Sequence, residues 1–543
     1  MRQIKRRFLL CLFISISNIL ALGVALSVEN EERPDPHTSI TIPELKDHMF
    51  FLASDELKGR LTASREYRIA ANYCVSQLRA AGLKPLVPDE KGNLSFLQRV
   101  PLIHKVLRSQ DVLCLKNPEG ETCFSHGDQC LVAMVQYPED TKVPVTSPVF
   151  VGYGICALEA GWDDYQDLNV EGKIVVCLHG APRVRGNPVL PAHDDERYSD
   201  LEKGAALKLQ TAEKHRAAGL VYILDPQTSR AWEMIKQMKV FTHDVLHYPG
   251  REPHPPRKMV PVVLLHPSAA RKMFEIYNYD PFVHQNTEDE NVIKCFLMDK
   301  TIMKMQLEYI RENVECQNVV AIAPGTDEAV GNQWIIVGAH LDHIGVRNGV
   351  VYNGADDNAS GCTAVLEVAE AIAMEPTRRP VIFILYTGEE FGLYGSTYFT
   401  EHCPVPLNQV AVNINMDMVG REGLEINVKG GIKAFGPAQK YLWLKKVLEK
   451  ANESSSNIPI DFTYPEEDTE RFFRIGDHFS FYKDGIPVIF FEDGGTEDLH
   501  KPTDDPEKID FTKLQNISQL VYALVMELGN TDENLQMRSQ QRQ

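Results

Sequence analysis

Residues 333–343 read Gln333-Trp-Ile-Ile-Val-Gly-Ala-His-Leu-Asp-His343, an apolar run that leads into two histidines and an aspartate. The run is short and rich in β-branched residues, which predicts a buried strand over 333–339. Similar apolar runs lie at 380–386, 409–416 and 487–491, with helical patterns between them. Strands that alternate with helices predict a mostly parallel sheet that is covered by helices on both faces.

Acidic residues and histidines follow each of these predicted strands. They are His340 and Asp342 after the first strand, Glu389 and Glu390 after the second, Asp417 after the third and His500 beyond the fourth. A loop with Asp356 and Asp357 opens the helix that is predicted to begin near Cys362. Ligands bind at the carboxyl ends of the strands in such sheets. We therefore expect these side chains to share one cleft although they are far apart in sequence.

Each of these residues has a simpler explanation when it is taken alone. A single histidine at a strand end is more often structural, and adjacent acids are usually solvated surface. Here, however, the carboxylates come directly after apolar strands, where an unpaired buried charge is costly unless a cation neutralises it. Imidazole and carboxylate together suit zinc, and two metals that share a carboxylate need about five such ligands. The sequence supplies that number.

Taken together, five motifs resemble the co-catalytic zinc exopeptidases, a family that includes secreted bacterial leucyl aminopeptidases, aminopeptidase Y and glutamate carboxypeptidase II. The motifs are His-x-Asp at 340–342, Gly-Ala-Asp-Asp-x-x-Ser-Gly at 354–361, Glu-Glu-x-Gly at 389–392, Met-Asp-Met at 416–418 and the final His500. The resemblance covers about 320–510, with every motif in order. It implies an α/β fold with a mostly parallel mixed sheet between helices, of the phosphorylase/hydrolase-like type, and two zinc ions.

The resemblance also implies a domain organisation. A mainly β protease-associated domain, inserted into the peptidase domain, is expected where strands and a helix interrupt the peptidase pattern. The expected parts are a signal peptide (1–27), the N-terminal part of the peptidase domain (28–129), the insert (130–300), the di-zinc peptidase domain (301–530) and a polar tail (531–543).

Roles for the site residues follow from the same resemblance. His340 and Asp417 are expected to bind one zinc ion and Glu390 and His500 the other, while Asp357 bridges the two. Asp342 is expected to accept a hydrogen bond from His340 and so to fix its tautomer. Glu389 is expected to act as the general base towards water and then to protonate the leaving amine. Chemistry alone would allow the roles of Glu389 and Glu390 to be exchanged.

Substrate contacts are less sharply defined by the sequence. Gly476-Asp477-His478 resembles a Ser-Asp-His motif near the substrate site of the family, and Arg421 falls within a matched motif. Asp477, His478 and Arg421 are therefore candidate substrate-binding residues, and His343 is expected to have a supporting role. Many family members carry a tyrosine four residues before that aspartate to stabilise the oxyanion. This chain has Phe473 there, with Arg474 beside it, so the oxyanion donor stays unassigned.

The composition limits the partners of the protein. The chain has 543 residues, 43% of them hydrophobic and 24% charged, which is long enough for two or three globular domains. The formal net charge of -19 argues against nucleic acid, because phosphate binding needs clustered Lys and Arg. The expected partner is a peptide substrate, and the sequence does not define an oligomeric state.

The N-terminus reads as a targeting segment. Four basic residues within 1–7 precede an apolar stretch at 8–26, and the small residues Ala25 and Ser27 offer a cleavage site before Val28. The stretch is long for a signal peptide, so it could instead remain as a membrane anchor. We expect export to the periplasm, the cell surface or the medium, with anchoring as the alternative.

The cysteines give a second indication of compartment. Ten lie beyond the targeting segment, and no Cys-x-x-Cys pair occurs, which argues against a zinc finger. Export permits disulfides, and Cys114, Cys123 and Cys130 are close enough in sequence to pair locally. The alternative is that several of the cysteines are simply small buried residues.

Three other functions compete with the aminopeptidase prediction. A receptor-like relative would have lost metal ligands, and a glutaminyl cyclase-like transferase would need only one zinc ion. A carboxypeptidase must bind a terminal carboxylate, usually through arginine. Acids outnumber arginines near the motifs, which favours a positively charged amino terminus. The arginines are Arg421, Arg471 and Arg474, and the acids are Glu422, Glu466, Glu467, Asp468, Glu470, Glu492, Asp493, Glu497 and Asp498.

Overall fold

The computed structural model describes residues 36–132, 141–184, 187–236, 244–249, 260–282, 293–347, 349–464 and 469–539. The predicted signal peptide lies outside these residues, as do the acids Glu466, Glu467 and Asp468. Among the described helices, none combines the length and the apolar character that crossing a membrane requires.

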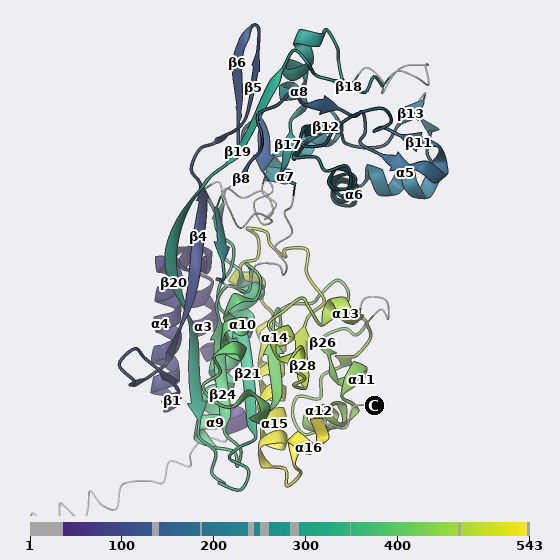
Figure 1. Cartoon of the computed structure of the whole chain (residues 1–543). Helices are drawn as coiled ribbons and strands as arrows, with labels where there is room; N and C mark the ends of the chain where they lie inside the picture. The colour runs from purple at the N-terminus through teal and green to yellow at the C-terminus, as the bar shows by residue number, and fades with distance from the viewer. Residues whose placement is uncertain are drawn as a thin grey trace, which may run out of the picture.

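A ten-stranded mixed sheet forms the larger part of the molecule (Figure 1). Nine strands follow the order β16-β4-β20-β24-β21-β25-β28-β26-β27, and β1 (Lys84–Pro85) pairs with β20. The last two strands of this order are β26 (Ile432–Phe435) and β27 (Ile460–Asp461). The four central strands run parallel: β24 (Val381–Tyr386), β21 (Trp334–His340), β25 (Val410–Met416) and β28 (Val488–Glu492). These are the four strands predicted from the sequence. The flanking pairs β20–β24 and β26–β28 are antiparallel, so the sheet is mixed as expected.

Helices cover this sheet on both faces. The helices α9 (Gly361–Met374) and α10 (Tyr394–Glu401) follow β21 and β24, and their crossovers run in opposite directions along the sheet, which places them on opposite faces. α9 packs with α3 (Ile42–Leu52), α4 (Arg65–Ala80) and α15 (Phe511–Asn530), and α10 packs with α14 (His478–Tyr482). The Asp510 carboxylate caps α15 by accepting the N–H groups of Thr512 and Lys513.

A six-stranded sheet forms the core of the smaller part, in the order β18-β9-β12-β15-β17-β7. Its outer strands are β18 (Phe296–Leu297), β9 (Val149–Phe150) and β7 (Cys130–Val132). Its parallel strands β12 (Ile174–Leu178), β15 (Gly219–Ile223) and β17 (Val262–Leu265) contribute alternate side chains to two separate apolar cores. The strands are therefore buried on both faces. Four helices accompany them, so this part holds more helix than the mainly β fold predicted for it. The helices are α5 (Ala192–Ser199), α6 (Leu201–Lys214), α7 (Trp232–Lys236) and α8 (Pro267–Phe274).

Two long antiparallel strands, β4 (Leu97–Leu107) and β20 (Tyr309–Ala323), connect the two parts: β4 leads to the smaller part and β20 leads back to the larger sheet (Figure 1). Pairing crosses the predicted domain boundaries in both directions. β16 (Asp244–His247), within the predicted insert, pairs with β4 of the larger sheet. β5 (Asp111–Asn117) and β19 (Ile302–Leu307), both from the predicted peptidase part, pair in a separate four-stranded sheet, in which β19 also pairs with β8 (Thr141–Lys142) of the predicted insert. The boundaries at 129/130 and 300/301 remain predictions.

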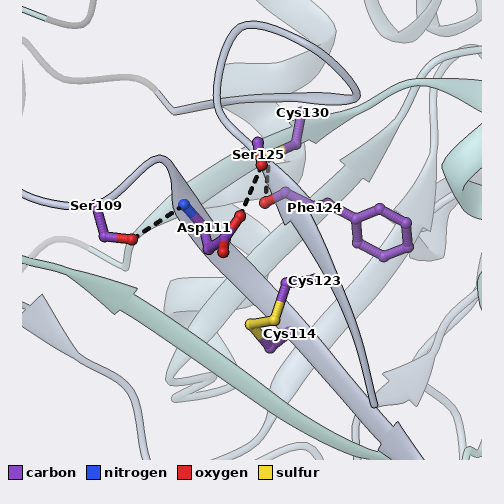
Figure 2. Close-up of a disulfide and its surroundings, with 7 residues drawn as sticks. All are labelled: Ser109, Asp111, Cys114, Cys123, Phe124, Ser125 and Cys130. Carbon is purple, nitrogen blue, oxygen red and sulfur yellow. Dashed lines mark hydrogen bonds between the residues drawn. A yellow bond between two sulfur atoms is a disulfide. The ribbon is translucent and has the colours of Figure 1, made fainter. Parts of the chain in front are cut away.

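One disulfide joins Cys114 in β5 to Cys123 in β6 (Gly120–Ser125), as Figure 2 shows. The third cysteine of the local set, Cys130, is free, and its thiol donates a hydrogen bond to the carbonyl of Phe124 over 3.4 Å. The prediction of local pairing is thus confirmed for one pair. The other cysteines of the described residues are free.

Candidate metal centre and active site

The predicted ligands meet at the carboxyl edge of the central parallel strands. His340 is the last residue of β21, Asp417 directly follows β25, and Glu390 lies in the loop after β24. Asp357 lies in the turn over Ala355–Ser360 that leads into α9. Parallel strands end at the same edge of a sheet, which is why residues so distant in sequence lie together.

The first ligand group consists of His340, Asp357 and Asp417. His340 Nε2 lies 3.3 Å from Asp357 Oδ1 and 3.2 Å from Asp417 Oδ1. The three ligand atoms are close enough to hold one metal ion. Burial lowers the pKa of His340, but the carboxylates of Asp417, Asp357 and Glu389 together outweigh that effect and raise the pKa well above its usual value.

A second ligand group surrounds the other oxygen of Asp357. His500 Nε2 lies 3.2 Å from Asp357 Oδ2 and 3.5 Å from Glu390 Oε1. His343 reaches the same two oxygens, with its Nδ1 3.6 Å from Asp357 Oδ2 and 3.0 Å from Glu390 Oε1. Asp357 therefore offers one oxygen to each group, as a bridging carboxylate does.

The chemistry of these groups fits divalent metal ions. Asp357 and Glu390 are buried, and Glu390 Oε1 has no hydrogen-bond partner among the described residues. Burial raises the pKa of Asp417, as expected for a carboxyl group enclosed with other acids. Imidazole nitrogens and carboxylate oxygens are ligands that zinc accepts. A cation at each group would neutralise carboxylates whose ion-pair partners among the described residues are histidines.

Asp342 departs from its predicted contact. The Nδ1 atom of His340 lies 3.0 Å from the main-chain carbonyl of Asp342, whereas the nearest carboxylate oxygen is 4.0 Å away. The carboxylate instead accepts hydrogen bonds from the Thr62 hydroxyl (2.7 Å) and from the N–H of Glu389 (3.2 Å). Asp342 thus contacts His340 through its main-chain carbonyl, because other donors occupy its carboxylate. Asp342 still holds both neighbours in place, through its carbonyl and its carboxylate.

Glu389 lies beside the ligands without belonging to either group. Its side chain is partly exposed, unlike that of Glu390. Burial raises the pKa of Glu389 well above its usual value, and the neighbouring acids Glu390 and Asp417 raise it further. A carboxylate that reaches solvent next to two metal ligand groups is placed to exchange protons with water there.

Two supporting residues have no assigned role in the sequence interpretation. Asp504 accepts the N–H groups of Asp356 and Asp357 at 3.0–3.1 Å and so fixes the turn that carries the bridging carboxylate. Arg60 is fully buried and donates to the carbonyls of Leu341 (2.9 Å) and Gly354 (2.9 Å). Asp504 lies only four residues after His500, which is a sequence signal; nothing in the sequence around Arg60 indicates its role.

Two of the candidate substrate-binding residues are enclosed. The His478 ring stacks on Phe490 with centroids 4.2 Å apart, and its Nε2 lies 2.9 Å from the Phe472 carbonyl. Asp477 is also fully buried, and burial raises its pKa to about 7. Neither side chain presents a surface to solvent, so substrate contact by these residues stays a prediction.

The third candidate, Arg421, is paired within the protein. Its guanidinium donates to Asp498 Oδ2 over 2.6 Å, and the same carboxylate oxygen accepts from Lys508 over 2.8 Å. Arg474 is exposed and lies against the Phe479 ring. Phe473, at the position of the expected tyrosine, is buried and stacks on Tyr482.

Known proteins match this part of the chain. Residues 318–525 match the model of peptidase family M28. A probable leucine aminopeptidase of Trichophyton verrucosum is 29% identical over 236 residues, 41% of this chain and 60% of that protein. Aminopeptidase YwaD of Bacillus subtilis is 29% identical over 205 residues, 36% of this chain and 40% of that protein. The matched segment thus spans about half the length of these relatives.

Solved structures resemble the whole chain. The aminopeptidase from Aneurinibacillus sp. strain AM-1 superposes with a TM-score of 0.54 and 16% identity, covering 92% of this chain and 96% of that one. A zinc aminopeptidase from Bacillus subtilis superposes with a TM-score of 0.53 and 17% identity, covering 91% and 97%. At such identities the likeness shows a shared fold. The segment that matches the model of peptidase family M28 carries the ordered motifs that lie at the edge of this sheet, so this part of the chain is similar to that family.

Proposed function

We propose that the protein is a zinc-dependent aminopeptidase that hydrolyses the amino-terminal peptide bond of peptides. The observation that carries the proposal is the pair of ligand groups that share Asp357, with Glu389 beside them. The similar proteins, a probable leucine aminopeptidase and aminopeptidase YwaD, support the same activity.

Two zinc ions fit the ligand groups. His340 and Asp417 would hold one ion, Glu390 and His500 the other, and Asp357 both. Bound zinc polarises the scissile carbonyl and lowers the pKa of water, so that water can attack at neutral pH.

Glu389 supplies the proton transfers of the proposed reaction. Its carboxylate accepts a proton from the attacking water and delivers that proton to the nitrogen of the departing peptide when the C–N bond breaks. The main-chain N–H of Glu389 is held by Asp342, which also contacts His340. This contact fixes the base relative to a metal ligand, and such positioning is what proton transfer requires.

The electrostatics of the site favour an amino terminus over a carboxylate. Arg421, the arginine nearest in sequence to the Asp417 motif, is bound to Asp498 and so cannot also clamp a terminal carboxylate without losing that pair. The site itself is rich in carboxylates, which attract an ammonium group.

A matched pair of short peptides tests this proposal. One peptide is acetylated at its amino end, and the other is amidated at its carboxyl end. An aminopeptidase releases the first residue of the amidated peptide and leaves the acetylated peptide intact. Release of the last residue of the acetylated peptide would instead identify a carboxypeptidase.

Two wider proposals accompany this function. We propose that the protein is exported, on the basis of the predicted signal peptide in residues 1–27. We also propose that the region within 130–300 is a protease-associated domain that supplies no metal ligand. In support, the ligand groups of the larger sheet draw only on residues 340–500. Mass spectrometry of the secreted protein tests export: a mass that lacks the residues of the predicted signal peptide would support it.

A further inference from the structure

A short segment of the predicted insert belongs to the core of the larger part of the molecule. Leu246, in β16, and Tyr248, just after it, are buried in the apolar core of the ten-stranded sheet. The parallel strands of the smaller sheet contribute instead to two other cores. β16 begins the strand order of the larger sheet, beside β4. The predicted insert therefore supplies an edge strand to the sheet that carries the candidate metal centre.

Helix α10, which follows the loop over 387–393, is bound to this segment at both ends. Tyr394, the first residue of α10, donates a hydrogen bond from its hydroxyl to the main-chain carbonyl of Leu246 over 3.0 Å. Glu401, the last residue of α10, accepts a hydrogen bond from the Tyr248 hydroxyl over 2.7 Å. The rings of Tyr248 and Tyr394 lie with their centroids 6.2 Å apart. One segment of the insert thus holds the whole length of this helix.

The same tyrosine closes the loop that precedes the helix. The N–H of Tyr394 donates to the Gly388 carbonyl over 3.0 Å and so joins the two ends of the loop. A Cβ atom at Gly388 would lie 3.1 Å from the Cβ of Tyr394, and one at Gly392 would lie 3.4 Å from its ring. Both glycines have a positive φ, +67° and +125°, which favours glycine. The position of Tyr394 therefore determines the path of the loop.

The two acids on this loop depend on its path in different ways. Glu390 belongs to a ligand group, so a bound metal ion would itself hold that carboxylate. Glu389 belongs to neither group, and its N–H is held by Asp342 over 3.2 Å. The direction of the Glu389 side chain therefore depends on the loop backbone. A displacement of a reacting group by about 1 Å can lower a rate about a hundredfold.

We infer that residues 244–248 of the predicted insert are a positioning segment of the active site, an inference that rests on the proposed function. Through Leu246 and Tyr394 this segment holds the start of α10, and with it the loop that places Glu389 beside the metal ligands. Through Tyr248 and Glu401 it holds the other end of the helix. The insert thus acts on the chemistry through the backbone of the loop.

The variant Tyr394→Phe tests this positioning, because it removes the hydroxyl that reaches Leu246 and keeps the ring. In the whole protein, loaded with zinc, kcat for an amidated peptide should fall about 5- to 100-fold, while KM and the zinc content should change less than about twofold. Hydrogen exchange measured by mass spectrometry should show faster exchange of the amides at 388–394.

The variant Tyr248→Phe makes the corresponding change within the predicted insert. It removes the hydrogen bond to Glu401 at the far end of α10 and should lower kcat about 2- to 10-fold, as expected for one lost hydrogen bond.

The variant Tyr398→Phe, on the same helix, is the matched control. The Tyr398 ring meets Tyr248 edge-on with centroids 6.0 Å apart, but its hydroxyl makes no hydrogen bond to any described residue. Its kcat and its loop exchange should equal those of the unaltered protein.

Different outcomes separate this inference from the proposed function. If the unaltered protein hydrolyses the peptide and Tyr394→Phe keeps its kcat, the inference is overturned and the function stands, even where the variant is less stable to heat. A fall in kcat that lost zinc explains, or an equal fall in Tyr398→Phe, would overturn the inference as well. An unaltered, zinc-loaded protein that hydrolyses no peptide would overturn both.

Discussion

Both large sheets of the molecule carry a histidine and an aspartate at the ends of parallel strands, and among the described residues only those of the larger sheet form a candidate metal centre. In the smaller sheet, His179 follows β12 and Asp225 follows β15, as His340 and Asp417 lie at the ends of β21 and β25 in the larger sheet. His179 Nδ1 lies 2.7 Å from Asp225 Oδ2, so that histidine and that acid pair with each other.

A buried lysine completes the edge of the smaller sheet. Lys208 donates to the carbonyls of Leu178 and Gly180, each over 2.7 Å. Burial lowers the pKa of Lys208 to about 8. At the edge of the smaller sheet one acid is paired with one histidine and the buried lysine is bound to main-chain carbonyls, whereas the edge of the larger sheet gathers the carboxylates of Asp357, Glu390 and Asp417. A histidine and an aspartate at strand ends are therefore not enough to indicate a metal centre. The feature that distinguishes the larger sheet is its excess of buried negative charge.

Among the substitutions that test this difference, Asp357→Ala should have the largest effect. Loss of the oxygen pair that both ligand groups share should release both metal ions. Metal stabilises the transition state by several kcal/mol, so peptide hydrolysis should fall about a thousandfold or more. Metal analysis and peptide turnover measure the two effects. Two retained ions in this variant would show that the groups do not share a bridging ligand.

Glu389→Gln should have the next largest effect and should separate chemistry from metal binding. The amide cannot accept a proton, so turnover should fall about 100- to 10,000-fold while the metal content stays unchanged. Glu422→Gln, at an exposed acid near Asp417 in sequence, is the matched control and should keep its activity. Near-normal turnover of Glu389→Gln would assign the base to another residue.

The smallest effect is expected from Asp225→Asn in the smaller sheet. Loss of this buried pair with His179 should lower the free energy of unfolding by about 1–3 kcal/mol, with metal content and turnover unchanged. Calorimetry measures the free energy of unfolding, metal analysis measures the metal content, and peptide hydrolysis measures the turnover. A loss of metal in this variant would contradict the separation of the two edges.

The same variant should also change how the stability of the protein depends on pH. Burial raises the pKa of Asp225, but its hydrogen bonds from His179 and Thr228 outweigh burial and hold the pKa well below its usual range. A depressed carboxyl pKa contributes stability that is present above pH 4 or so and is lost as the pH falls below it. The variant should therefore lose less stability on acidification than the unaltered protein does.

The sequence by itself determined the four central strands, the helices between them and the ligand types. These features depend on local patterns, because an apolar run of strand length followed by a histidine or an acid predicts both the strand and the placement of the polar residue at its end. The predictions for His340, Asp357, Glu390, Asp417 and His500 rest on five short motifs that are each continuous in the chain.

Only the tertiary structure decided which of these residues pair and which stay unpaired. The bond from His340 to the Asp342 carbonyl, the pairing of Arg421 with Asp498 and the enclosed ring of His343 all join residues through backbone geometry or through distant elements. The edge of the smaller sheet makes the same point, since His179 and Asp225 are 46 residues apart and meet only because β12 and β15 are neighbours. Sequence patterns report the side chain at a strand end, and the packing around it decides whether its charge is already matched.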